Sequence, residues 1–367
     1  MASHETGRSR PARPFLSRRS LNRRLAMLPL ALGACAGERA CDAPPAAPPH
    51  HTPGGFRNPP GSPVREGDFG DWFGFFYRGL TRGAEVPLPE GHVLPEAVVQ
   101  ERLGAHRSTG ASLTWLGHAT FLIHLAGRTI LTDPFLSEHA SPVPPLGPRR
   151  FAPAGLTASQ LPPIDLLLLS HNHYDHLDLP TIEALGRTSR TAAIVPLGLG
   201  PYFSERGYER VHELDWGDEA NLGPLRIKPL PAIHFSKRTL FDRNRTLWSG
   251  YAIDGGGRRL YFAGDTAYGP IFREIAAQEA PFDLALLPIG AYEPRRLMRA
   301  SHATPEEAVQ IGREFRARRL VAMHWGTIQL TDEPPFEPPL RFRAAAREAG
   351  YGEEDALLMA IGETRPI

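Results

Sequence analysis

The sequence predicts an α+β fold in which two β-sheets pack face to face and helices cover the outer faces. Short apolar runs of strand length come first in the compact region, and strands alternate with helices after them. Several of these runs end on a histidine or an aspartate. Side chains at strand ends meet along one edge of a sheet, so the pattern also predicts a single functional site there.

The strands are expected where apolar runs are bounded by glycine, proline or polar clusters. They cover residues 113–118, 120–125, 129–134, 164–169, 192–195, 225–234, 248–253, 259–263, 282–287 and 320–326. Gly255–Gly257 lie between two of these strands, which indicates a hairpin turn and not a phosphate cradle. Pro180 and Pro305 each open a helix, the second with Thr304 as its N-cap. Residues 138–163 form a long proline-rich excursion, a candidate wall of the site.

Composition limits the classes of function. The 367 residues are 41% hydrophobic, which is enough for a large core, and their formal net charge is +1. Residues 1–34 contain seven Arg and one Glu, a net charge of +6, so the remainder carries 1 − 6 = −5. An acidic body disfavours nucleic-acid binding. Both cysteines, Cys35 and Cys41, precede the body, which therefore has no disulfide, no thiolate ligand and no Cys nucleophile.

Residues 1–34 resemble an export signal, with a basic start and a short apolar run. Leu32-Gly33-Ala34-Cys35 resembles a bacterial lipobox, and Ser17-Arg18-Arg19-Ser20-Leu21 resembles a twin-arginine signal. The apolar run is too short to cross a bilayer. These features predict a lipoprotein anchored through Cys35 to a bacterial cell envelope, facing the periplasm or the exterior. The alternative is a disordered basic tail from a misassigned start, which would leave a cytoplasmic protein.

Two segments separate this signal from the compact domain, which is expected to begin at residue 111. Residues 35–66 are rich in proline and predict a disordered tether in which His50 and His51 are solvated. Residues 67–110 form an aromatic extension. Within residues 69–80, aromatic side chains recur at helical spacing. This helix is expected to pack onto the domain, and the alternative is a lipid-facing lip at the mouth of the site.

The metal-binding chemistry is concentrated in residues 170–178, Ser-His-Asn-His-Tyr-Asp-His-Leu-Asp, which follow the apolar strand 164–169. His171 and His173 can turn to one ion, while Asp175 and His176 turn to a second. Imidazole and carboxylate ligands suit zinc, iron or manganese. The alternative is a polar loop whose histidines cap the next helix. Because structural loops rarely need so many ligating side chains in one turn, we favour a metal pair.

Three further candidate ligands stand at strand ends, namely His234, Asp265 and His324. The first ion is assigned to His171, His173 and His234, and the second to Asp175, His176 and His324, with Asp265 as a bridge. A water between two ions loses a proton near neutral pH, giving a hydroxide that can attack a phosphodiester. His118 and Asp133 also end strands, and either could orient the ligands or be a buried structural residue.

These motifs resemble those of the metallo-β-lactamase superfamily, and within it the N-acylphosphatidylethanolamine-hydrolysing phospholipase D family. The resemblance extends over roughly residues 110–365 and includes the metal loop and the segments 114–120, 131–134, 161–165, 234–239, 262–266, 288–295 and 324–327. It implies a four-layer αββα fold, two zinc ions and the ligand set given above. His302 matches a family histidine near the substrate, where it orients the substrate or assists proton transfer. The alternative for His302 is a surface residue before a helix.

The function predicted from the motifs and the resemblance is hydrolysis of N-acylphosphatidylethanolamine to N-acylethanolamine and phosphatidate, with Asp175, Asp265 and His302 as catalytic residues. The alternative on the same site is a lactonase or carboxyl-ester hydrolase, since the ligands do not distinguish a carbonyl from a phosphoryl group. A non-enzymatic metal-binding protein is disfavoured by the complete ligand set. The partners considered are the phospholipid, a membrane surface reached through Cys35 and residues 69–80, and a second copy of the chain.

Overall fold

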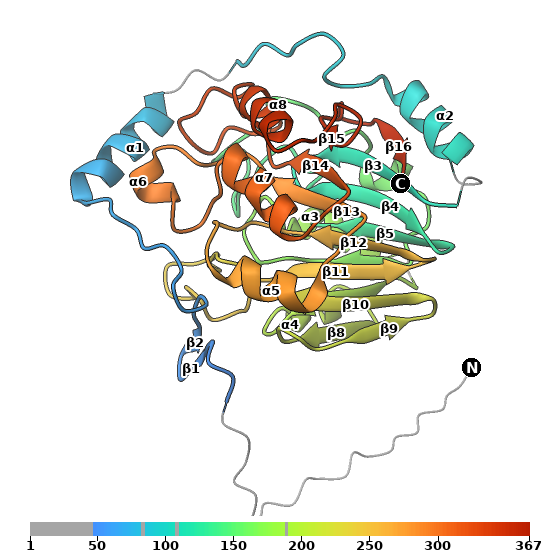
Figure 1. Cartoon of the computed structure of the whole chain (residues 1–367), viewed down its shortest axis with the longest axis horizontal. Helices are drawn as coiled ribbons and strands as arrows, with labels where there is room; N and C mark the ends of the chain where they lie inside the picture. The colour runs from blue at the N-terminus through green and yellow to red at the C-terminus, as the bar shows by residue number, and fades with distance from the viewer. Residues whose placement is uncertain (1–46, 82–84, 107–109, 188–189) are drawn as a thin grey trace, which may run out of the picture. The chain divides into compact units, whose positions relative to one another are not determined.

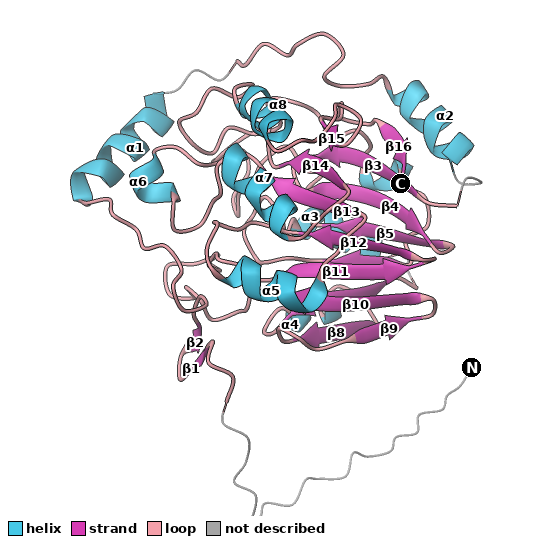
Figure 2. Ribbon diagram, viewed as in Figure 1, coloured by secondary structure: helices cyan, strands magenta, loops and turns pink. Residues whose placement is uncertain are grey.

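The computed structural model describes residues 47–367 except 82–84, 107–109 and 188–189, and the predicted signal and lipidated Cys35 lie outside the described residues. Residues 47–367 form one compact unit. It contains two seven-stranded sheets, and Figure 2 shows their strands with the helices around them. No helix of the described residues is long and apolar enough to cross a membrane.

The first sheet has the strand order β15-β14-β13-β12-β11-β10-β9. Its strands are β9 (Ala220–Leu222), β10 (Leu225–Leu230), β11 (Gly250–Gly255), β12 (Arg258–Phe262), β13 (Leu284–Pro288), β14 (Arg319–Met323) and β15 (Ala356–Leu357). Strands β9 to β12 pair antiparallel, whereas β12 to β15 pair parallel. Parallel neighbours need a crossover, and α5 (Ile271–Glu279) and α7 (Pro305–Glu314) supply it.

The second sheet has the order β16-β3-β4-β5-β6-β7-β8. Its strands are β16 (Thr364–Pro366), β3 (Ser112–Gly117), β4 (Thr120–Leu125), β5 (Arg128–Thr132), β6 (Leu166–Leu168), β7 (Ala192–Pro196) and β8 (Arg210–Leu214). Helix α3 (Leu179–Gly186) connects β6 to the parallel β7, and α4 (Gly200–Ser204) connects β7 to β8. Three further elements follow the start of this sheet in the chain, namely η1 (Ala158–Gln160), α6 (Arg295–Met298) and α8 (Pro338–Glu348).

The main hydrophobic core lies between the two sheets. It joins Trp115 and Phe121 of the second sheet to Tyr251 and Leu286 of the first. A separate cluster lies on the outer face of the second sheet and includes Leu167 together with Ile182 of α3. Helix α7 contacts β13 and β14, and it lies in front of them with α5 and α8 nearby in Figure 1. The layers are therefore helix, sheet, sheet and helix, which confirms the predicted αββα sandwich.

The strands that were not predicted are short or lie at the edges of the sheets. Strand β8 is mostly exposed, and β15 and β16 have only two and three residues. Edge strands need less apolar surface, so they lack the alternation by which strands are found in a sequence. Helices α5 and α8 were also not predicted.

The described part of the predicted tether, residues 47–66, is not disordered as expected. Residues 47–66 follow a defined path, in which β1 (His51–Thr52) pairs with β2 (Gly55–Phe56). Nε2 of His50 lies 2.6 Å from one carboxylate oxygen of Asp215, and Nε2 of His51 lies 2.7 Å from the other. His50 is buried and stacks on Trp216, so it is not solvated. Burial alone raises the pKa of Asp215, but the imidazole hydrogen bonds lower it overall.

This segment also reaches a candidate ligand. The side-chain oxygen of Asn58 accepts hydrogen bonds from the backbone N–H of His234 at 3.0 Å and from Nε1–H of Trp248 at 3.1 Å. Order in residues 47–66 therefore comes from contacts with residues far along the chain, which composition does not reveal.

The aromatic extension forms α1 (Phe69–Thr81) and α2 (Glu96–His106). Helix α1 is held by ion pairs from Arg296 to Asp71 and from Arg78 to Asp332. Its aromatic residues do not all pack inwards, because Phe69, Phe73 and Tyr77 are 84%, 64% and 60% exposed. The spacing of four residues places these three side chains on one face of the helix. Phe69, Phe73 and Tyr77 therefore do not pack onto the domain as expected, and the contacts to the domain described above are ion pairs.

We expect the Asp215→Ala substitution to loosen residues 47–57. It removes the acceptor of two imidazole hydrogen bonds, so the free energy of unfolding should fall by about 1–2 kcal/mol. Urea denaturation measures the fall, and hydrogen exchange should locate faster exchange in residues 47–57. The exposed neighbour His212→Ala is the control. Equal exchange in the Asp215 variant and the parent would contradict the contacts described.

Candidate metal centre

The candidate ligands come from loops that leave both sheets at neighbouring strand ends. Residues 170–178 connect β6 to α3, whereas His234 follows β10 and Asp265 follows β12. His324 follows β14, and the backbone N–H of His324 donates to the backbone carbonyl of His118 at 3.0 Å. Strands from two sheets thus bring His234, Asp265 and His324 to the loop that carries the other four candidate ligands, at a place where open sheets commonly hold their sites.

The ligand atoms gather in two groups, in each of which they lie within 4.8 Å of one another. The first group contains His171, His173, His234 and Asp265, and the second contains His118, Asp175, His176 and His324. Every ligand proposed from the sequence is present in one of these groups. His118 lies in the second group although the sequence left open whether it was a structural residue, and its Nε2 is 2.8 Å from Oδ2 of Asp175, so it orients that carboxylate.

Asp265 lies between the two groups. Its Oδ2 is 3.8 Å from Nε2 of His171, 3.7 Å from Nε2 of His234 and 3.2 Å from Nε2 of His176. Its Oδ1 is 3.3 Å from Nε2 of His324. One carboxylate therefore faces ligands of both groups, which is the geometry expected of a bridging ligand.

Three ligand atoms around Asp265 fit a metal ion better than they fit one another. Among the described residues, Nε2 of His176, Nε2 of His324 and Oδ1 of Asp265 are buried without a hydrogen-bond partner, whereas Nδ1 of His173 lies 2.8 Å from Nε2 of His171. Buried polar atoms are normally paired, because an unpaired one costs about 1–3 kcal/mol. Unpaired atoms that converge on a common centre are satisfied by a divalent cation. The set of imidazoles and carboxylates without a thiolate is compatible with zinc, iron or manganese.

The trio of His50, His51 and Asp215 provides a contrast. It also carries ligand types within 4.8 Å of one another. However, each carboxylate oxygen is already within hydrogen-bond distance of one imidazole, so the three side chains satisfy one another. Hydrogen bonds within this cluster therefore account for it, whereas Nε2 of His176, Nε2 of His324 and Oδ1 of Asp265 keep no such partner among the described residues.

The histidines of the first group are neutral at pH 7. Burial lowers the pKa of His173 to about 3 and that of His234 to about 4, and it holds the pKa of His171 well below its ordinary value. A neutral imidazole presents the lone pair that a metal requires. The second group behaves differently: burial alone lowers the pKa of His324, but Asp265 and Asp175 raise it to about 9. The same carboxylates raise the pKa of His176.

Outer hydrogen bonds fix the orientation of the ligands. Asp133 accepts from Nδ1–H of His176 at 2.7 Å and from the backbone N–H of Ser170 at 2.7 Å. Nδ1 of His234 lies 2.8 Å from the backbone carbonyl of Ser301, so it donates there and Nε2 faces the centre. Of the two interpretations left open for Asp133, the structure supports the orienting one. Such partners commonly change metal affinity by 10–100-fold.

The backbone is strained at three residues of the centre. His118, Asp133 and His324 have φ angles of 55°, 29° and 61°, in the left-handed region that side chains other than glycine rarely adopt. Each such residue costs on the order of 1–3 kcal/mol, which the surrounding fold must offset. This backbone conformation turns the three side chains inwards directly after their strands.

His302 lies beside both groups. Its ring centroid is 5.1 Å from that of His234 and 5.6 Å from that of His324, and its Nδ1 is buried without a hydrogen-bond partner. Burial holds the pKa of His302 well below its ordinary value, so its imidazole is neutral at pH 7. The alternative of a surface residue before α7 is therefore not what the structure shows.

Sequence reasoning missed Arg238, which secures the metal loop. Its guanidinium donates to the backbone carbonyls of Asn172 and Leu177 at 2.8 Å each, and it stacks 3.9 Å from the ring centroid of Tyr174. The hydroxyl of Tyr174 in turn donates to the carbonyl of Arg238. Arg238 lies in the segment 234–239 that carries the family resemblance, but it is far in sequence from the loop that it holds, so the sequence did not indicate this role.

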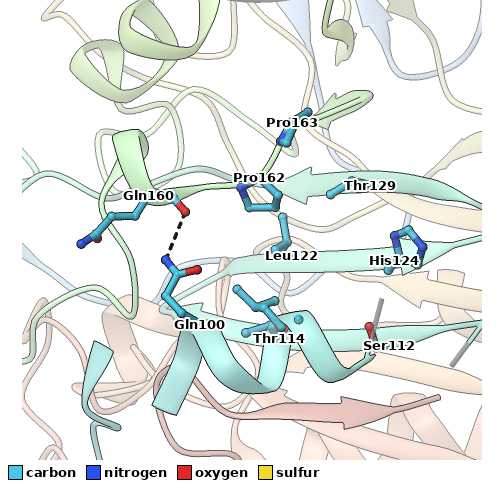
Figure 3. Close-up of a pocket in the computed structure, with 11 residues that line it drawn as sticks. Gln100, Ser112, Thr114, Leu122, His124, Thr129, Gln160, Pro162 and Pro163 are labelled. Atoms are coloured by element: carbon cyan, nitrogen blue, oxygen red, sulfur yellow. Dashed lines mark hydrogen bonds between the residues drawn. The ribbon is translucent and has the colours of Figure 1, made fainter. Parts of the chain in front are cut away.

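A separate cavity of about 220 Å3 lies between α2 and the outer face of the second sheet (Figure 3). Hydroxyls of Ser112, Thr114 and Thr129, the ring of His124 and the side chain of Leu122 line it. The lining holds no carboxylate and none of the ligands around Asp265. It therefore lacks the groups needed for the chemistry of the metal centre.

We expect metal affinity to increase with pH in a way set by the second group. Below pH 9 the imidazole of His324 is protonated in the metal-free protein, so a metal must displace that proton. Affinity measured by chelator competition should rise at least about tenfold per unit between pH 6 and pH 8. The contribution of His324 to this increase in metal affinity should end near pH 9, above which its imidazole is already neutral. Affinity that stays constant across this range would contradict the assignment of His324.

Comparison with known proteins agrees with this geometry. The β-lactamase superfamily domain matches residues 128–325, more than half of the chain. A Caenorhabditis elegans protein named N-acyl-phosphatidylethanolamine-hydrolyzing phospholipase D 1 is 40% identical over 245 residues, which are 64% of this chain and 69% of that protein. An uncharacterized protein of Mycobacterium tuberculosis is 42% identical over 240 residues. The alignment spans 64% of the length of this mycobacterial relative and 64% of this chain.

A solved structure shows the same fold. A metallo hydrolase of the archaeon Ignicoccus hospitalis superposes with a TM-score of 0.52 at 23% identity, over 70% of this chain and 98% of the other. This likeness concerns the fold alone. The domain match and the C. elegans relative, together with the two histidine–carboxylate groups at the sheet edge, establish the family. The chain belongs to the metallo-β-lactamase superfamily.

Proposed function

We propose that this protein is a metal-dependent hydrolase that cleaves N-acylphosphatidylethanolamine-type phospholipids to N-acylethanolamine and phosphatidate. The position of Asp265 between two ligand groups carries the proposal, because it supports a site for two cations and not one. Paired cations can stabilise the attacking and the leaving oxygen of a displacement at phosphorus. The similarity to the C. elegans phospholipase D supports the choice of lipid.

Two zinc ions, or iron or manganese in their place, would supply Lewis acidity that lowers the pKa of water and neutralises charge on a phosphoryl oxygen. His171, His173 and His234 would hold one ion, and His176, His324 and Asp175 the other. His118 accounts for the placement of Asp175, since its Nε2 lies 2.8 Å from Oδ2 of that carboxylate.

His302 is proposed as a substrate-facing residue. Its neutral imidazole has an unused nitrogen beside both ligand groups, so it can hydrogen-bond to a bound substrate or accept a proton from it. Asp175 and Asp265 remain ionised, because the pKa of each is held well below its ordinary value. Burial alone would raise both pKa values, but the positive charge of the neighbouring His176 outweighs it.

We further propose that the protein works at a membrane surface. The exposed aromatic face of α1, formed by Phe69, Phe73 and Tyr77, is suited to the interface between headgroups and acyl chains. A lipidated Cys35, outside the described residues, would keep the chain at a bacterial envelope.

Product analysis by mass spectrometry tests the reaction. Purified metal-loaded protein should release N-acylethanolamine and phosphatidate from N-acylphosphatidylethanolamine in mixed micelles. His173→Ala and Asp265→Asn should each lower the rate by more than about a hundredfold, because loss of an outer partner alone already costs 10–100-fold. His212→Ala, an exposed histidine, should not change it.

Two outcomes would contradict the proposal. Near-parental activity of either ligand variant at limiting metal would reject the site. Hydrolysis of a lactone or carboxyl ester with no release from the phospholipid would keep the site and replace the substrate by the alternative class.

A further inference from the structure

We propose that the loop of residues 237–245, between β10 and β11, inserts its tip into a lipid surface that carries anionic headgroups. This loop would dock the protein so that the metal centre faces the lipid, and the inference rests on the proposed function only in that the substrate is a lipid. The loop is Lys-Arg-Thr-Leu-Phe-Asp-Arg-Asn-Arg, and it begins three residues after His234.

The tip of the 237–245 loop is apolar and fully presented to solvent. Leu240 is 81% exposed and its neighbour Phe241 is 86% exposed. Single exposed apolar residues are common on soluble proteins, but two large ones in succession at a loop tip are not explained by packing. Two adjacent apolar side chains in water are stabilised when an apolar phase covers them.

The tip is held in shape by its own hydrogen bonds. The carboxylate of Asp242 accepts from the backbone N–H of Arg238 at 3.1 Å and from that of Thr239 at 2.8 Å. The backbone N–H of Phe241 is 3.3 Å from the hydroxyl of Thr239. These bonds close the turn and point the two apolar side chains outwards. The protein therefore presents a preorganised tip, so docking does not require ordering of the loop.

Positive charge surrounds the tip. The 237–245 loop contains Lys237, Arg238, Arg243 and Arg245 against Asp242, a net charge of 4 − 1 = +3. Lys237, Arg243 and Arg245 are exposed. Each basic residue near an anionic lipid surface contributes on the order of 1 kcal/mol. An apolar tip with flanking cations matches the acyl chains and the phosphates of such a surface, whereas a protein partner would have to supply both features by a complementary patch.

The loop is joined rigidly to the metal centre. The backbone N–H of Lys237 donates to Oδ1 of Asn172 at 2.8 Å, and Arg238 holds the carbonyls of Asn172 and Leu177. A tip that enters lipid therefore fixes the distance between the headgroup layer and the ligands of residues 171–176. The region next to α1 lies close to the loop. The guanidinium of Arg65 stacks on Trp72 of α1, and burial, with the charge of Arg243 as a second cause, lowers the pKa of Arg65.

Vesicle flotation tests the docking. The full chain should float with vesicles of phosphatidylcholine and phosphatidylglycerol, and less with phosphatidylcholine alone. The double variant Leu240→Ser/Phe241→Ser should weaken binding by at least about tenfold, because two buried apolar side chains are lost from the lipid phase. Leu340→Ser, a 67% exposed leucine of α8, is the matched control and should bind like the parent. Metal content and thermal midpoint of each variant verify that the fold is intact.

A second measurement reports insertion itself. The Phe241→Trp variant should lose the fluorescence of its added tryptophan in vesicles with brominated acyl chains, and the parent should change less. Equal binding of the double variant and the parent, or no quenching, would overturn the proposal. Concentration-dependent dimerisation that the double variant abolishes, without vesicle binding by the parent, would assign the tip to a second copy of the chain and would also overturn it.

Docking and catalysis can fail separately. Vesicle binding that depends on Leu240 and Phe241 without release of N-acylethanolamine would leave the docking standing and reject the substrate. Release of N-acylethanolamine by a double variant that binds vesicles like the parent would leave the reaction standing and reject the docking.

Discussion

The structure depends on the burial of two carboxylates among imidazoles at the junction of two sheets. Asp175 and Asp265 are both almost fully buried, and charges in this position are tolerated only when they are paired. The paired groups come from four strand ends and one metal loop, so the two sheets must pack in one register for the charges to be compensated. Packing of the two sheets therefore forms the centre, and the paired charges of the centre favour that one packing.

Segments outside the ligand loops keep this arrangement in place. Asn58, in the N-terminal segment, accepts a hydrogen bond from the backbone N–H of His234. Arg238, in the loop after β10, donates one to a backbone carbonyl of the metal loop. Asp133 anchors both Ser170 and His176. These contacts oppose the backbone strain at His118, Asp133 and His324. A centre that is preorganised in this way need not rearrange when a metal or a substrate arrives.

Much of the fold and most of the centre follow from local sequence patterns. The metal loop was visible because its ligands crowd into nine residues after a buried strand, and His234, Asp265 and His324 because each ends an apolar run. His118 could not be assigned, because only its left-handed backbone turns the ring towards Asp175. Order in residues 47–66 was missed because hydrogen bonds with distant residues, and not apolar content, hold that segment. The short edge strands were not predicted for a related reason, because pairing with neighbouring strands stabilises them and their own sequence does not.

Asp265 lies between two ligand groups and would therefore stand between two cations when both groups are occupied. Anomalous X-ray diffraction from crystals of the zinc-loaded protein, recorded at the zinc absorption edge, should show two peaks. We expect one among His171, His173 and His234 and the other among Asp175, His176 and His324, with Asp265 between them. A single peak, or a peak at His50, His51 and Asp215 in place of either, would contradict this arrangement.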